Sequence, residues 1–149
     1  MIRRSFLLAG LCILAACANE PDTLITKDMV DGDTIPAALT ETPGRIEAGR
    51  NTFANREAGH CVLCHQVASL DTPFQGNLGP SLDRVGDRLS AAQLRLRIVD
   101  YQRVRPGTVM PSYYRTNDLY RVEEDYVGKP VLTAQQVEDL VAYMESLKD

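Results

Sequence analysis

Histidine, cysteine and clustered positive charge are all scarce in this chain of 149 residues. It holds two histidines, His60 and His65, and four cysteines, two of which fall within the first 17 residues. The histidines lie too close together to serve a separate Ser-His-Asp or Cys-His nucleophile set, and a zinc site would need four ligands that this composition does not offer. No basic cluster occurs and the formal net charge is -4, so nucleic acid is not an expected partner.

The longest apolar run, residues 6–16, is too short to cross a bilayer stably. With Arg3 and Arg4 before it, this run predicts a signal peptide over residues 1–18 and export to the periplasm. The end of the leader is open to two interpretations. Residues 14–17 resemble a lipobox, in which Cys17 is acylated and tethers the chain to the membrane, and Ala16-Cys17-Ala18 also fits ordinary cleavage.

A Cys-x-x-Cys-His motif occupies residues 61–65. On a helical turn, positions i, i+3 and i+4 share one face. Cys61 and Cys64 can therefore form thioethers with the two vinyl groups of one porphyrin, while His65 presents a nitrogen to its iron. This spacing is the attachment signature of a c-type haem. One covalent haem c is the expected cofactor, and a fortuitous pair of buried thiols is the alternative.

An iron held by one histidine needs a sixth ligand or keeps an open site. Met110 is the preferred candidate, because it lies in a restricted loop between Gly107 and Pro111; the alternative is a surface-loop methionine. Met144 lies in an apolar helical stripe, where methionine is more often core than ligand. A thioether ligand favours ferrous iron and raises the reduction potential relative to a second histidine. With both axial positions filled, we expect outer-sphere electron transfer and no catalytic residue.

The mature chain divides into a polar segment, residues 19–43, and a folded unit, residues 44–149. The first reads as an extended arm or linker, with plain disorder as the alternative. In the second, helical periodicity predicts helices over residues 45–55 and 90–101 and a last helix after Thr133. Ser90 and Thr133 each precede a glutamine by three positions, which is the capping-box pattern of a helix start. No strand is expected, so the fold class is all-α.

Further residues resemble class I cytochromes c. In that family the first and last helices cross at a glycine and at aromatic residues, matched here by Gly49, Phe53 and Tyr143. The resemblance implies the class I cytochrome c fold, with helices wrapped round one haem. It also implies that the carbonyl of Pro80 orients His65 through its other ring nitrogen.

A longer likeness covers almost all of residues 45–148. Residues 76–82, 97–100, 108–114 and 128–140 resemble the SoxX family, the small monohaem subunits of the SoxAX cytochromes of bacterial sulfur oxidation. The resemblance implies a heterodimer with a SoxA-like cytochrome, acting as an L-cysteine S-thiosulfotransferase that couples thiosulfate oxidatively to a cysteine thiol of the carrier SoxYZ. This chain would bind no substrate. It would pass electrons from the SoxA haem site to a downstream c-type cytochrome. The lipobox departs from this family, whose members are usually soluble.

Two other functions stay open: a free-standing or membrane-tethered electron shuttle, and a haem-based ligand sensor in which Met110 is labile. Residues 112–131 bear on the choice of partner, because they contain four of the six tyrosines. Tyrosine is favoured at protein interfaces, where it offers apolar area with a polar tip. The segment is therefore expected either to dock a SoxA-like partner or to pack on the chain's own haem edge. The four tyrosines are Tyr113, Tyr114, Tyr120 and Tyr126.

Overall fold

A computed structural model describes residues 24–149, and the leader, with Cys12 and Cys17, lies outside the described residues. Within the described part every regular element is helical, and the only β-bridge is an isolated pair, Asp31 with Thr34. The all-α prediction is therefore confirmed. The helices are η1 (Lys27–Met29), α1 (Ile46–Ala54), η2 (Cys61–Leu63), α2 (Val85–Arg88), α3 (Ala91–Asp100), η3 (Tyr101–Arg103), η4 (Glu124–Tyr126) and α4 (Ala134–Ser146).

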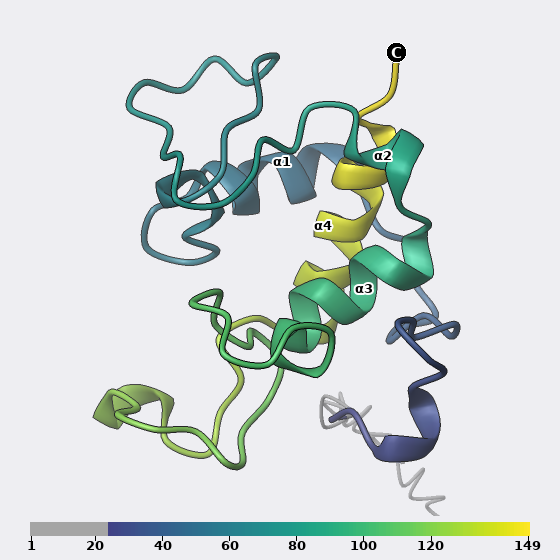
Figure 1. Ribbon diagram of the computed structural model, residues 1–149, viewed down its shortest axis with the longest axis vertical. Helices are drawn as coiled ribbons and strands as arrows, with labels where there is room; N and C mark the ends of the chain where they lie inside the picture. The colour runs from purple at the N-terminus through teal and green to yellow at the C-terminus, as the bar shows by residue number, and fades with distance from the viewer. Residues whose placement is uncertain (1–23) are drawn as a thin grey trace, which may run out of the picture.

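Helix α4 runs through the middle of the molecule, and α1, α2 and α3 all pack against it (Figure 1). The crossing with α1 is close because Gly49 has no side chain: a Cβ at this position would overlap the backbone carbonyl oxygen of Asp139. One turn later, the ring of Phe53 meets that of Tyr143 edge-on, with centroids 5.7 Å apart. Both rings are buried, so the predicted crossing of the first and last helices is present.

Both capping boxes form as the sequence indicates. The Ser90 hydroxyl accepts from the backbone N–H of Gln93, and the Thr133 hydroxyl accepts from that of Gln136, with the reciprocal glutamine contacts also present. Each box satisfies backbone donors that a helix start leaves without partners. The short helix α2 was not predicted. Four residues are too few to show a helical period, and α2 is held by tertiary contact, where Gly86 N–H donates to the carbonyl of Leu147.

The polar arm is fixed to the helices over its second half. Ile35 is fully buried and its backbone N–H donates to the carbonyl of Ala92 in α3. The side chain of Arg95 donates to the Ile35 carbonyl and forms two hydrogen bonds, of 2.7 and 2.9 Å, with Glu138 of α4. Glu138 also accepts from the backbone N–H of Leu39. This buried ion pair ties the arm to two helices, so the folded body reaches upstream of residue 44.

Candidate haem-binding site

The Cys-x-x-Cys-His motif forms a single helical turn. Cys61–Leu63 is a 3₁₀ helix, entered through His60 in the left-handed region at φ +57°. The backbone N–H groups of Cys64 and His65 both donate to the carbonyl of Cys61. The turn thus has the i, i+3, i+4 arrangement that the spacing predicts, although it does not continue as a regular helix.

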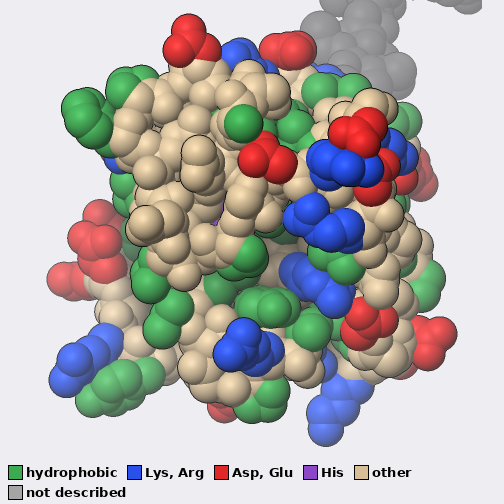
Figure 2. Space-filling model, turned by 45° about the horizontal axis from the view of Figure 1, so that its top comes forward, with side chains coloured by type: hydrophobic (Ala, Val, Ile, Leu, Met, Phe, Trp, Pro, Cys, Tyr) green, Lys and Arg blue, Asp and Glu red, His purple; other side chains and the backbone are tan. Residues whose placement is uncertain are grey.

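This turn forms one wall of a cavity of about 390 Å³. Cys61, Cys64 and His65 line it on the side of the motif, and Met110 lines it from the loop after α3. The volume lies within the range of roughly 300–1,000 Å³ that small-molecule and cofactor sites occupy. Figure 2 shows a hollow lined by hydrophobic side chains, with Lys and Arg side chains along one flank. The structure therefore brings the predicted attachment residues and the predicted sixth ligand together around one space.

His65 is held in a defined orientation. Its Nδ1 lies 2.8 Å from the carbonyl oxygen of Pro80. With the proton on Nδ1, this ring nitrogen donates to Pro80 and leaves Nε2 as the free base, which is the arrangement that outer-sphere partners impose on metal-binding histidines. Gly79 packs against the same ring, and any Cβ there would overlap His65. Gly79 thus limits the position of the imidazole, and the Pro80 carbonyl fixes its tautomer.

Both methionines of the folded unit, Met110 and Met144, line the cavity. Met110 is partly buried in its loop, and Met144 is 6% exposed on α4. Met144 belongs to the hydrophobic core, as its apolar stripe predicts. It also faces the cavity, which the stripe did not indicate. His60 and Met29, the other histidine and the other methionine that the structure describes, do not line the cavity.

Two of the four tyrosines in residues 112–131 lie inside the molecule. Tyr113 is 6% exposed and lines the cavity, and Tyr114 is 1% exposed. Tyr113 therefore follows the second expectation for residues 112–131, packing on the chain's own haem edge, because its ring lies inside the molecule and lines the cavity. Burial, together with the nearby sulfurs of Cys61 and Cys64, raises the pKa of the Tyr113 hydroxyl. A tyrosine's side-chain chemistry is the same in a core and at an interface, so only the path of the chain separates the two.

The donor set and the walls fit a haem. Burial raises the pKa of the Cys61 thiol to about 12, so without a porphyrin this sulfur is an uncharged thiol in an apolar wall. Leu78, Ile98 and Val109 supply hydrophobic surface, and Arg105 is the one Lys, Arg, Asp or Glu side chain among the lining residues that the structure describes. An apolar cavity with two thiols, an oriented imidazole and thioethers suits an iron porphyrin.

Among models of protein families, that of cytochrome c matches residues 46–148. The chain belongs to the cytochrome c family. Membership implies a covalently bound c-type haem, and it confirms the class I cytochrome c fold that the helix crossing indicated.

This cytochrome c is also similar to a solved structure, the crystal structure of SoxXA from P. pantotrophus. The two share 37% sequence identity with a TM-score of 0.73, and the match covers 78% of this chain and 91% of that chain. The SoxX resemblance drawn from residues 76–140 is thereby confirmed. A comparison with curated proteins finds no match.

Proposed function

We propose that this cytochrome c is the single-haem electron-transfer subunit of a SoxAX-type complex. The observation that carries the proposal is a single cavity that Cys61, Cys64, His65 and Met110 all line. The similarity to SoxXA, which covers 91% of that chain, supports it. Cys61 and Cys64 would hold the haem covalently, and His65 and Met110 would be its axial ligands. When bound, the haem supplies one-electron redox chemistry.

The residues around the cavity would tune that chemistry. Pro80, which accepts from Nδ1 of His65, would keep the imidazole available as a base for the iron. The Met110 thioether favours the ferrous state and raises the reduction potential. Apolar walls would limit water near the metal, and Arg105, which lines the cavity, would offset propionate charge.

In the complex, this chain would serve a two-electron reaction. A sulfur of thiosulfate would bond to the cysteine sulfur of a SoxYZ-like carrier, the thiol would lose its proton, and two electrons would be released at the SoxA-like site. Since a single haem carries one electron at a time, this subunit would act twice per turnover and pass each electron to a downstream c-type cytochrome. It would thus be the subunit of an L-cysteine S-thiosulfotransferase that holds no substrate.

The partner would dock on the exposed apolar tip of the segment between α3 and α4. Tyr120 is 84% exposed and Val127 is 64% exposed, whereas Tyr113 and Tyr114 pack inside. Arg121 lies over the Tyr120 ring, 5.2 Å from its centroid, which presents the aromatic face together with a positive charge. Tyrosine and arginine are both enriched at binding hot spots.

Co-purification of the native chain tests this function. Recovery of a SoxA-like cytochrome with wild-type protein, and its loss from a variant carrying Tyr120→Ala and Val127→Ser, is the expected result. The matched control is Phe74→Ser, which removes a side chain that is 90% exposed on a different loop. Isolation of the native chain alone would favour the shuttle function instead.

The N-terminal predictions belong to the same proposal. We propose residues 1–18 as a signal peptide, residues 19–43 as an arm whose second half packs on the cytochrome domain, and residues 44–149 as that domain, with Cys17 either acylated or removed in the periplasm. Over residues 24–149 the structure contains no helix with the length and apolar character to span a membrane. Mass spectrometry of the mature N-terminus distinguishes a lipid-bearing Cys17 from a cleaved leader.

A further inference from the structure

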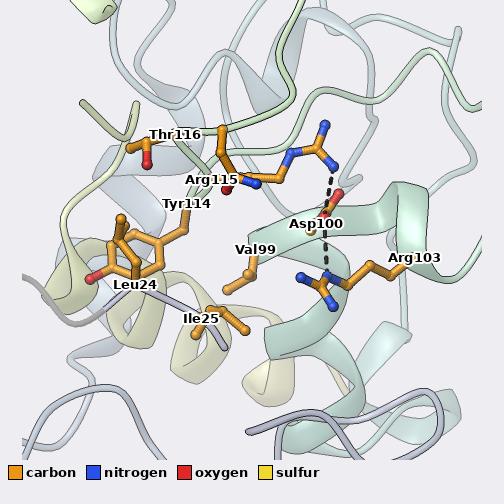
Figure 3. A pocket seen from close by; sticks show the side chains of 9 residues that line it. Leu24, Ile25, Val99, Asp100, Arg103, Tyr114, Arg115 and Thr116 are labelled. Atoms are coloured by element: carbon orange, nitrogen blue, oxygen red, sulfur yellow. Dashed lines mark hydrogen bonds and ion pairs between the residues drawn. The ribbon is translucent and has the colours of Figure 1, made fainter. Parts of the chain in front are cut away.

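A buried carboxylate closes the base of the loop that carries Met110. Asp100 is the last residue of α3 and is 2% exposed. Its Oδ1 accepts from the hydroxyl of Ser112 at 2.6 Å, and its Oδ2 accepts from the guanidinium groups of Arg103 at 3.2 Å and Arg115 at 3.0 Å. Figure 3 shows Asp100 between the two arginines, with both ion pairs drawn. A carboxylate this buried persists because three donors replace its water.

These four residues stand on the two stems of one loop. Asp100 and Arg103 lie where the chain leaves α3, and Ser112 and Arg115 lie where it returns after Met110. Between the stems, residues 105–111 have no regular structure and Val109 is 78% exposed. Backbone bonds from Tyr113 to Ile98 and from Tyr114 to Val99 also join the stems, at 3.3 and 3.2 Å. Asp100 adds the charged side-chain link, and its shortest bond is two residues from Met110.

We propose that Asp100 is a positioning residue, which holds the Met110 loop closed over the haem cavity and thereby keeps the thioether available to the iron. The inference rests on the proposed ligand role of Met110. A ligand on a loop is lost whenever the loop opens, so the fraction of open loop sets how readily an outside ligand takes its place. Weakening the bonds of Asp100 to Ser112, Arg103 and Arg115 raises the fraction of open loop without touching the haem.

The test uses imidazole as the probe and the full haem-loaded chain in the ferric state. The variants are Asp100→Asn, which removes the charge, and Ser112→Ala, which removes the shortest bond and disturbs the packing less. The control is Glu138→Gln, because Glu138 is also a buried carboxylate paired with an arginine of α3 but does not line the cavity. Visible spectra report imidazole affinity, and thermal unfolding reports overall stability.

We expect imidazole to bind about tenfold more tightly to Asp100→Asn, since a lost charge-assisted bond changes an opening equilibrium by at least about that factor. Ser112→Ala should show a smaller increase, and Glu138→Gln should show none despite its lower unfolding temperature. Unchanged affinity in Ser112→Ala and in folded Asp100→Asn overturns the inference, and so does an equal rise in all three variants. If Asp100→Asn does not fold, Ser112→Ala decides alone.

Failure of the ligand assignment is distinguishable. Met110→Ala would then leave the wild-type spectrum unchanged, whether that spectrum lacks the charge-transfer band of ferric iron bonded to a thioether or owes the band to Met144. That result overturns the role of Met110 and the role of Asp100 with it. A band that Met110→Ala abolishes, together with unchanged imidazole affinity in Asp100→Asn and Ser112→Ala, overturns the role of Asp100 only.

Discussion

The close contact of Gly79 with His65 makes the substitution Gly79→Ala a sharp test of the haem site. A Cβ at position 79 would overlap three atoms of the imidazole ring. The ring cannot keep its place, so it must rotate or move away from the Pro80 carbonyl and lose the 2.8 Å contact with Nδ1. The change leaves Cys61 and Cys64 intact, so the haem would remain covalently attached.

The magnitude follows from the role of such outer partners. Their loss from a metal-binding histidine costs about 10- to 100-fold in metal affinity or activity, which corresponds to roughly 1.4–2.8 kcal/mol. We expect Gly79→Ala to carry haem by mass, to lose part of its six-coordinate low-spin spectrum and to shift in reduction potential. Spectroscopy and a redox titration of the purified chain measure these changes.

Gly128→Ala is the matched control. Gly128 has φ +71°, and a Cβ there meets nothing within 4 Å, so alanine introduces backbone strain without contact with the haem site. It should lower stability and leave the spectrum and the potential as in wild type. A Gly79→Ala protein with the wild-type spectrum and potential would refute the argument that Gly79 and Pro80 together orient His65.

Three further predictions address the sixth ligand, the buried ion pair and the loss of stability at low pH. Met110→Ala should abolish the thioether-to-iron band in the visible spectrum and lower the reduction potential. Met144→Leu, a substitution of similar volume, should leave the band and the potential unchanged. The reverse pattern in visible spectra and redox titration would assign Met144 as the ligand. Glu138→Gln should lower the free energy of unfolding by about 3–5 kcal/mol, as expected when one partner of a buried pair is removed, and a denaturant titration that finds less than about 1 kcal/mol would contradict this. Burial raises the pKa of Asp139, but hydrogen bonds from Arg45 and Gln135 outweigh it and lower that pKa below its usual 3.8. Asp139 therefore stabilises the fold above pH 3.8 and loses this effect as pH falls through its folded pKa. The gap in unfolding temperature between wild type and Asp139→Asn should close in that range, and a constant gap would show that the carboxylate charge is not the cause.

Much of the candidate site was predictable because its signals are local. The spacing of Cys61, Cys64 and His65 places three groups on one turn whatever the rest of the chain does, since i, i+3 and i+4 neighbours meet by helix geometry alone. The capping boxes at Ser90 and Thr133 are local for the same reason, and both form as predicted. The restricted loop of Met110 predicts its role as ligand, and the structure brings that loop to the cavity.

Other features depend on contacts between distant residues, and no local pattern indicates them. Tyr113 and Tyr120 have the same chemistry seven positions apart, yet one is 6% exposed at the cavity and the other is 84% exposed. The pair of Arg95 with Glu138 joins residues 43 positions apart, and it converts a polar arm into part of the folded body.

The cofactor chemistry, the helix starts and the helical class of this cytochrome c follow from local patterns in the sequence, because short-range geometry dictates all three. Three further features follow from the tertiary fold: the burial of Tyr113 and Tyr114, the position of Met144 at the cavity, and the link that Asp100 makes between both stems of the Met110 loop. Those outcomes depend on contacts between residues that are far apart in the sequence. A carboxylate such as Asp100 is stable in the interior only where folding delivers its donors, and its own neighbours in the sequence do not specify that place.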